Sequence, residues 1–175
     1  MPSARGSGLE TYMKLALIGL TIFVSALPGW TQEAKPLDSA IAALSKFVGG
    51  EWKADGDMPI THRWEWNADK RGLNANNVIV MPGGKKMLSR VFIGWDPLAK
   101  KTYYLDMHDS EKTYHGHITE KDGVVEFRFG ELGSGREDFI ERGKFVGDDE
   151  WQAGLYQIRE SKEVLIVSFK MRRSR

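Results

Sequence analysis

Three histidines in the middle of the chain are the residues best suited to metal chemistry. His115 and His117 are two residues apart, and side chains at this spacing on a β-strand point to the same face. His108, on the preceding strand, could supply a third imidazole, and three histidines are a known ligand set for zinc. No aspartate or glutamate shares their face, however, and Thr113 and Thr119 flank it as on a solvated strand. We therefore predict an exposed polar face and no bound metal or other cofactor.

A second group of residues could line a small-molecule site. Trp64 and Trp66 share a strand face with His62, so the tryptophans either line a cavity or pack in the core. The candidate ligand-binding residues are Trp64, Trp66, Arg90, Phe92, Tyr104 and Asp106.

Arg90 is included because it shares a strand face with Leu88 and Phe92. An arginine on an otherwise apolar face could bind a ligand carboxylate through both arms of its guanidinium. It could equally form a structural salt bridge with Glu65 or Asp106. The sequence leaves both interpretations open.

No arrangement of a catalytic nucleophile is evident. The serines lack the Gly-x-Ser-x-Gly pattern of a nucleophile elbow. Asp106 and His108 are elements of a triad, but both also occur in ordinary strands. The glycines of segment 130–135 do not stand between a strand and a helix, as a phosphate-binding loop requires. We predict no catalytic residues.

The elements that must position these side chains are mostly short strands. Residues 36–48 form the one predicted helix, with Asp38 as its N-cap and Gly49-Gly50 at its end. Alternation of apolar and polar residues, broken by turn residues such as Asp-Gly and Pro-Gly, predicts ten strands after it. They span about 51–56, 60–67, 73–81, 86–95, 101–108, 112–120, 123–130, 136–145, 150–159 and 163–171.

Short connections between these strands predict antiparallel pairing, because parallel strands need long crossovers. Ten strands in up-and-down order would leave two exposed edges in an open sheet, and closure removes both. The predicted fold is therefore all-β, a single antiparallel up-and-down barrel of about ten strands with one short N-terminal helix.

The N-terminal segment resembles an export signal. Met13-Lys14 precedes an uncharged run from Leu15 to Leu27, which fits a secretory signal peptide and is short for a bilayer span of about 20 residues. We predict a start at Met13, a leader over residues 1–33, and a barrel domain over 34–175. The protein is then periplasmic or secreted, with no membrane anchor after cleavage. An uncleaved anchor is the alternative.

Composition supports a soluble domain that folds on its core alone. The formal net charge is +1 and there is no cysteine, so neither a dedicated nucleic-acid surface nor a disulfide-stabilised core is expected. Five tryptophans after the leader provide a large apolar area. We expect a monomer that does not bind nucleic acid.

The segments FVGGEW (47–52) and FIGWDP (92–97), followed by Tyr103-Tyr104 and Asp109-Ser110, resemble the calycin superfamily. The closer resemblance is to a bacterial, exported, lipocalin-like family of unknown function. It implies a ten-strand barrel, with Gly50 and Trp52 as structural residues. In lipocalin-like barrels a basic side chain from the last strand covers this tryptophan. Lys170, Arg172 or Arg173 lies in the matching place, and we take Arg172 as that residue.

The chain is also similar to the haem-binding nitrobindins, which share the Gly-x-Trp opening. Their haem-ligating histidine lies near the C-terminus, whereas residues 150–175 contain no histidine here. We therefore expect no haem.

Three functions remain compatible with the sequence. The first is an exported protein that holds an apolar or amphipathic small molecule in the barrel. The second is an enzyme or a haem or metal protein that uses His115, His117 and Arg90. The third is a structural protein whose barrel is filled by side chains.

Overall fold

The computed structural model describes residues 37–55 and 59–174. The chain divides into two units, residues 1–35 and 36–175, and the described residues all lie in the second. The predicted leader and its cleavage sites lie outside the described residues.

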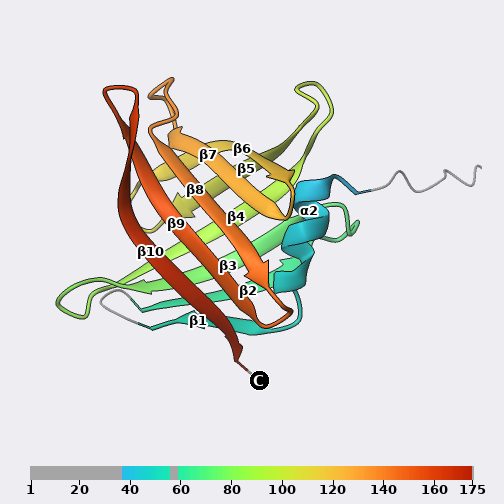
Figure 1. Cartoon of the computed structure of the whole chain (residues 1–175), viewed down its shortest axis with the longest axis horizontal. Helices are drawn as coiled ribbons and strands as arrows, with labels where there is room; N and C mark the ends of the chain where they lie inside the picture. The colour runs from blue at the N-terminus through green and yellow to red at the C-terminus, as the bar shows by residue number, and fades with distance from the viewer. Residues whose placement is uncertain (1–36, 56–58, 175) are drawn as a thin grey trace, which may run out of the picture. The chain divides into compact units, whose positions relative to one another are not determined.

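The described residues form a closed antiparallel barrel of ten strands, which confirms the predicted fold (Figure 1). Each strand pairs with its neighbours in sequence, and β1 pairs with β10 to close the sheet. The strands are β1 (Glu51–Ala54), β2 (Ile60–Trp66), β3 (Leu73–Val80), β4 (Lys86–Asp96), β5 (Lys101–His108), β6 (Thr113–Lys121), β7 (Val124–Glu131), β8 (Phe139–Val146), β9 (Glu150–Arg159) and β10 (Lys162–Ser174).

Two strand ends differ clearly from the prediction. β8 begins at Phe139 and not at 136, because residues 132–138 form an irregular connection in which Gly133 and Gly135 have positive φ angles. β10 continues to Ser174, because its last residues pair with β1 and so complete the barrel.

The predicted helix is present as α2 (Ser39–Leu44) followed by one 3-10 turn, η1 (Ser45–Phe47). Asp38 caps α2, since its Oδ1 accepts a hydrogen bond from the backbone N–H of Ala40 at 3.0 Å. The same oxygen accepts a second hydrogen bond from Thr102 Oγ1 on β5 at 2.6 Å. One carboxylate therefore both starts the helix and ties it to the barrel wall.

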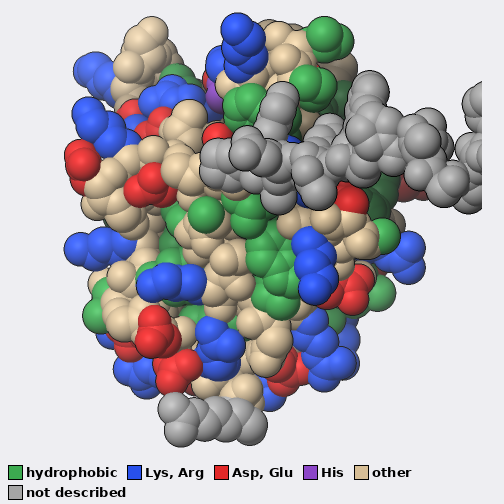
Figure 2. Space-filling model, turned by 90° about the vertical axis from the view of Figure 1, so that its right-hand side faces the viewer, with side chains coloured by type: hydrophobic (Ala, Val, Ile, Leu, Met, Phe, Trp, Pro, Cys, Tyr) green, Lys and Arg blue, Asp and Glu red, His purple; other side chains and the backbone are tan. Residues whose placement is uncertain are grey.

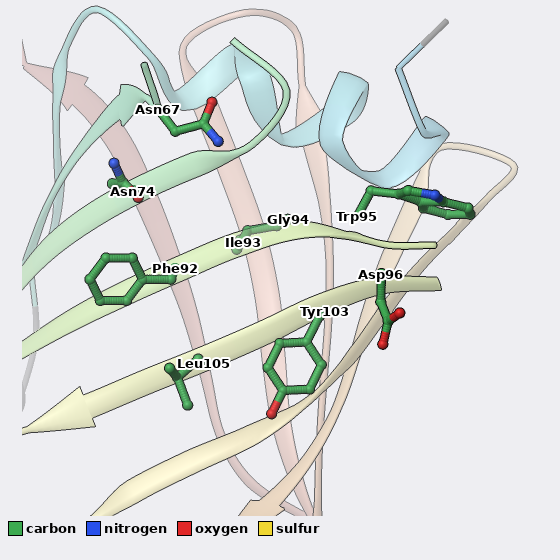
Figure 3. A pocket seen from close by; sticks show the side chains of 9 residues that line it. All are labelled: Asn67, Asn74, Phe92, Ile93, Gly94, Trp95, Asp96, Tyr103 and Leu105. Atoms are coloured by element: carbon green, nitrogen blue, oxygen red, sulfur yellow. The ribbon is translucent and has the colours of Figure 1, made fainter. Parts of the chain in front are cut away.

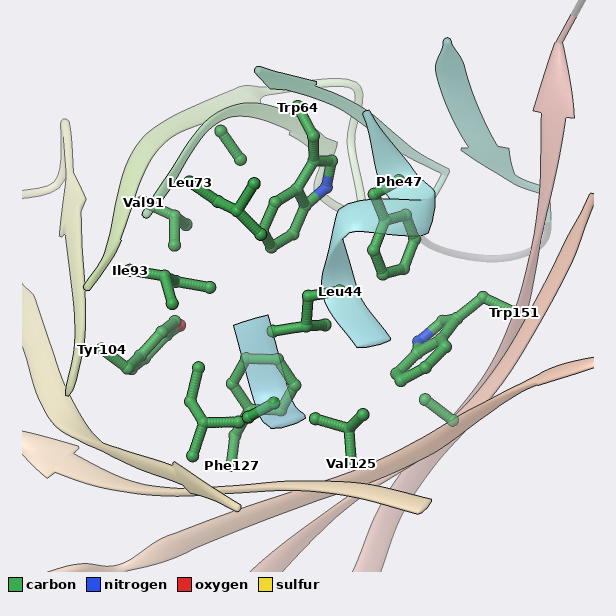
Figure 4. Close-up of a cluster of buried hydrophobic side chains, with 14 of the residues drawn as sticks. Leu44, Phe47, Trp64, Leu73, Val91, Ile93, Tyr104, Val125, Phe127 and Trp151 are labelled. Carbon is green, nitrogen blue, oxygen red and sulfur yellow. The ribbon is translucent and has the colours of Figure 1, made fainter. Parts of the chain in front are cut away.

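Apolar side chains fill the barrel where the helix meets it (Figure 4). Leu44 and Phe47 lie inside the ring of strands, where the Phe47 ring stacks on Trp64 and meets the edge of Trp151. Burying each large side chain contributes roughly 1.5–3 kcal/mol. The buried residues of this cluster are Ala40, Ile41, Leu44, Phe47, Trp52, Ala54, Trp64, Leu73, Ala75, Val91, Ile93, Tyr104, Ile118, Val125, Phe127, Trp151, Ala153 and Met171.

Trp52 and Arg173 pack together at the end of the barrel that contains the helix. Trp52 is fully buried and its indole N–H donates to the carbonyl oxygen of Phe47 at 3.0 Å. The Arg173 guanidinium lies over the Trp52 ring at 4.8 Å and donates to the carbonyl oxygens of Lys46 and Asp148. A Cβ at Gly50 would stand 3.0 Å from the Arg173 side chain, so glycine leaves room for it.

The basic side chain that covers Trp52 is therefore Arg173. The prediction from sequence that Arg172 covers it was wrong. In the strand register Trp52 stands opposite Arg173, so the two side chains share the inner face. Arg172 points to the outer face, where its Nε contacts Glu150 at 3.2 Å.

Charged side chains of both signs are interspersed on the face displayed in Figure 2. Within the described part of the chain, no helix has the length and apolar character needed to cross a membrane.

Candidate functional site

Four polar side chains form a row across the inner faces of β2 to β5. The register places His62 opposite Asn77, Asn77 opposite Ser89, and Ser89 opposite His108. Cross-strand partners point to the same face of a sheet, so these residues are neighbours although the sequence separates them widely. Asn77 and Ser89 are buried, and the Asn77 amide donates to Ser89 Oγ at 3.0 Å. We call these four residues the polar row.

Asp106 joins the polar row to Tyr104 within β5. Residues 104, 106 and 108 alternate along the strand and therefore share its inner face. The Tyr104 hydroxyl donates to Asp106 Oδ2 at 3.0 Å, and His108 Nε2 lies 3.0 Å from the same oxygen. The other ring nitrogen of His108 lies 3.3 Å from the sulfur of Met87. A hydrogen-bonded chain of Tyr104, Asp106 and His108 thus faces the interior.

Three buried polar atoms in this region have no hydrogen-bond partner among the described residues. They are Asp106 Oδ1, Asn77 Oδ1 and His62 Nδ1. Asp106 is 8% exposed and Asn77 7%, so neither side chain can turn to solvent. A buried polar atom without a partner costs roughly 1–3 kcal/mol. Such atoms mark a site where a ligand could supply the missing hydrogen bonds.

Glu141 on β8 faces the same interior. It stands opposite Phe127, an interior residue of β7. Burial, and to a lesser degree the charge of Asp106, raises the pKa of Glu141 to about 7. Burial lowers the pKa of His62 to about 4, although the charge of Asp106 acts in the opposite direction. Because Asp106 influences both groups, the two carboxyl groups and the imidazole share one space.

The same buried charge acts on Tyr104. Burial, and then the charges of Asp106 and Glu141, raises the pKa of this hydroxyl well above its ordinary value. Tyr104 therefore stays protonated and acts as a hydrogen-bond donor at neutral pH.

Aromatic rings from β6, β7 and β8 adjoin these polar groups. Tyr114 meets His108 with ring centroids 5.2 Å apart, and Phe129 meets Tyr104 at 5.5 Å. Phe139 stacks on Phe129 at 5.6 Å. We call Tyr114, Phe129 and Phe139 the aromatic wall. The polar row and Asp106 therefore meet an apolar surface, an arrangement suited to an amphipathic molecule.

The interior is less fully covered at the end of the barrel away from α2. Interior residues at the helix end, such as Trp52 and Leu73, are fully buried. Ile79, Met87 and Phe139, which face inward near the other end, are partly exposed. We call this second half of the interior the distal half. The distal end is therefore the more open end of the interior.

The structure separates the six residues proposed from sequence as ligand-binding. Tyr104 and Asp106 belong to the interior cluster. Trp64 lies in the core, where it stacks on Phe47, and Trp66 is half-buried against the same core. Arg90 and Phe92 lie on the outer face of β4, since their inward neighbour Val91 is buried whereas they are exposed.

The three histidines proposed as metal ligands do not converge. His108 faces inward, but His115 and His117 lie on the outer face of β6, opposite Leu105 and Tyr103. His115 Nδ1 is hydrogen-bonded to the Tyr103 hydroxyl at 3.1 Å, and His117 Nδ1 lies 3.2 Å from Glu137. Across residues 37–55 and 59–174, no group of three or more His, Cys, Asp or Glu side chains could hold a metal ion.

Two grooves on the outside of the barrel are weaker candidates. The groove over β3 to β5 has a volume of about 430 Å³, and Figure 3 shows Phe92, Tyr103 and Leu105 along it. Its carboxylate, Asp96, already accepts hydrogen bonds from the backbone of its own turn. The groove over β8 to β10 has a volume of about 610 Å³. Neither contains the unpartnered buried polar atoms of the interior.

Sequence reasoning missed four members of the interior site, His62, Asn77, Ser89 and Glu141. One signal was present, because His62 shares a strand face with Trp64 and Trp66. Asn77 and Ser89 become neighbours only through the register of β3 and β4.

No protein-family model matches the chain, and no curated protein matches it in sequence.

Proposed function

We propose that the protein is an exported, lipocalin-like binding protein that holds an amphipathic small molecule in the distal half of its barrel. The observation that carries the proposal is the pair of buried, unpartnered oxygens on Asp106 and Asn77. A bound polar group would complete their hydrogen bonds, and the aromatic wall would cover the apolar part of the ligand. Export is inferred from the leader sequence alone.

A structural protein with a filled barrel fits only half of the molecule. The helix end is packed with apolar side chains. The distal half instead contains acceptors without partners and partly exposed aromatic rings. This combination supports ligand binding over a purely structural role.

An enzyme is the second candidate, and one observation favours it. The hydrogen-bonded chain of Tyr104, Asp106 and His108, with Glu141 nearby, contains groups that could move protons near neutral pH. This candidate no longer relies on His115, His117 or Arg90, which lie on outer faces. Chemical turnover of the bound molecule would indicate an enzyme, whereas its release unchanged would indicate a binding protein.

Native mass spectrometry of protein purified from its own host tests the proposal. We expect a co-purifying small molecule that is lost from Asn77→Leu, which removes an unpartnered acceptor. The molecule should be retained by Arg90→Ala, a change on the outer face of the neighbouring strand. Retention in Asn77→Leu together with loss in Arg90→Ala would place the ligand outside the barrel and refute the proposal.

The same material tests the expectations on export and cofactors. N-terminal sequencing should find a chain that begins after the apolar run 15–27, and an intact Met13 would contradict export. A visible absorption scan and elemental analysis should show neither haem nor a stoichiometric metal.

A further inference from the structure

We infer, on the basis of the function proposed above, that the polar end of the ligand is a protonated amine held by Asp106 and Asn77. The inference rests on which charges and which hydrogen-bonding atoms face the distal interior.

The unpartnered atoms of the polar row and Asp106 can all accept a hydrogen bond, whereas the unpartnered indole N–H of Trp64, in the core beside His62, is a donor. Asp106 Oδ1 is a carboxylate oxygen, which only accepts. The Asn77 amide already donates to Ser89, so its free Oδ1 is an acceptor as well. His62 Nδ1 accepts when the proton of the neutral ring is on the other nitrogen. A ligand that matches these atoms must carry several donors, and an ammonium group carries three.

The fixed charges facing this space are acidic. Asp106 on β5 and Glu141 on β8 provide carboxyl groups, and their partners Tyr104, Tyr114, His62 and His108 provide no permanent positive charge. Among the described residues, basic side chains at inward-facing strand positions lie at the two ends of the barrel, and Lys162, opposite Arg159 in the register, is one of those at the distal end. Arg173 covers Trp52 at the helix end, and Arg159 is exposed at the distal rim beside Gln157.

A ligand carboxylate or phosphate beside Asp106 would therefore meet like charge, and the arginine and lysine that could compensate it lie at the distal rim. A neutral alcohol would provide one donor but no charge to balance Asp106. A metal ion is a poor alternative, because no group of three or more potential ligand side chains is assembled in the described part of the chain. A protonated amine satisfies both the charge and the acceptors.

The aromatic wall fits the same ligand. Tyr114 and Phe129 adjoin His108 and Tyr104, the two partners of Asp106. Aromatic faces attract cations within about 6 Å of the ring centroid, and they also cover the apolar body of an arylalkyl or alkyl amine. The structure thus favours a small primary amine with an apolar chain or ring.

Matched probes that share one apolar group and differ in their polar group test this assignment. Binding of 2-phenylethylamine, 2-phenylethanol and 3-phenylpropanoate is measured by calorimetry at pH 7.5 in 0.15 M salt, and repeated with hexylamine, hexanol and heptanoate. We expect each amine to bind about tenfold or more tightly than its alcohol, and the acids not to bind. Asp106→Asn should weaken amine binding about tenfold and leave alcohol binding unchanged, whereas Glu65→Gln, on the outer face of β2, should change neither.

The wild-type protein provides a second test that does not depend on the folding of a variant. Amine affinity should rise severalfold from pH 6 to pH 8, because Glu141 ionises in this range and adds negative charge beside the amine. In Glu141→Gln this rise in amine affinity should be lost. The affinity of the alcohol should stay nearly constant.

Each outcome is decisive. Equal binding of amine and alcohol, tighter binding of the acid, or an unchanged amine affinity in Asp106→Asn would overturn the amine assignment while leaving an interior binding site intact. Failure of all six probes to bind would also overturn it. The proposed function itself would fall only if, in addition, native protein carried no ligand mass.

Discussion

His62 and Glu141 face the same buried charge, yet their pKa values move in opposite directions. Burial favours the neutral form of both groups, which means the deprotonated imidazole of His62 and the protonated carboxyl of Glu141. Between about pH 4 and pH 7 both groups are therefore mainly neutral. Above about pH 7 Glu141 adds a second negative charge to the interior beside that of Asp106.

The two shifts predict opposing effects of pH on stability. The pKa of Glu141 is raised from 4.5 to about 7, so its stabilising contribution is complete below pH 4.5 and is lost as the pH rises toward 7. The pKa of His62 is lowered from 6.5 to about 4, so its contribution is complete above pH 6.5 and is lost as the pH falls toward 4. Each effect amounts to at most about 3 kcal/mol, and the two largely cancel between pH 4.5 and 6.5.

In Glu141→Gln, the effect of His62 on the pH dependence of stability should no longer be cancelled. The free energy of unfolding of this variant should rise more steeply than that of the wild type from pH 4.5 to 6.5. In His62→Gln, by contrast, it should fall relative to the wild type over the same range. Urea unfolding at pH 4.5, 5.5 and 6.5 provides the measurement. Parallel pH profiles for all three proteins would show that these groups do not titrate as the buried geometry requires.

At the scale of elements, α2, η1 and the end of β10 act together to close one end of the barrel. Asp38 ties the start of α2 to β5, and Phe47 inserts into the core. Arg173, near the end of β10, binds carbonyl oxygens of η1 and of the 147–149 turn while it covers Trp52. Because this end is filled, we expect any ligand inside the barrel to bind in the distal half.

Neighbouring arginines on β10 offer a matched test of this closure. Arg173→Lys keeps the charge but loses the planar fork that reaches two carbonyl oxygens and lies on the Trp52 ring, so it should lower the free energy of unfolding by about 1–2 kcal/mol. Arg172→Lys, on the outer face, should change it by less than about 0.5 kcal/mol. Chemical denaturation of both variants checks the difference, and equal effects would show that Arg173 does not hold the end of the barrel.

At the scale of the whole molecule, the sequence was sufficient to predict the strands and their closure, because both follow from local patterns. Alternation and turn residues mark each strand, and short connections leave only antiparallel pairing. The cap at Asp38 and the break at Gly49 were also readable, since they depend on adjacent residues.

The interior site was harder to predict because it depends on register and on which strand face turns inward. β4 shows the difficulty, since Leu88 and Phe92 are at least as apolar and as large as Val91 and Ile93, yet Val91 and Ile93 face the core. Arg90 was therefore assigned to the wrong surface for a ligand in the barrel. Tyr104 and Asp106, named as candidates from the sequence, face the interior. Their partners on β2, β3 and β8 become neighbours only in the closed barrel.

The most direct test of an interior site is methyl NMR with a neutral amphipathic probe, which is independent of the amine assignment. On addition of hexanol or 2-phenylethanol, the methyl resonances of Ile79, Leu155 and Val167, whose side chains face the distal interior, should shift in a saturable manner. Those of Leu88 and Leu105, on the outer surface, should stay unchanged. Saturable shifts confined to Leu88 and Leu105, with none at the interior methyl groups, would contradict a binding site inside the barrel.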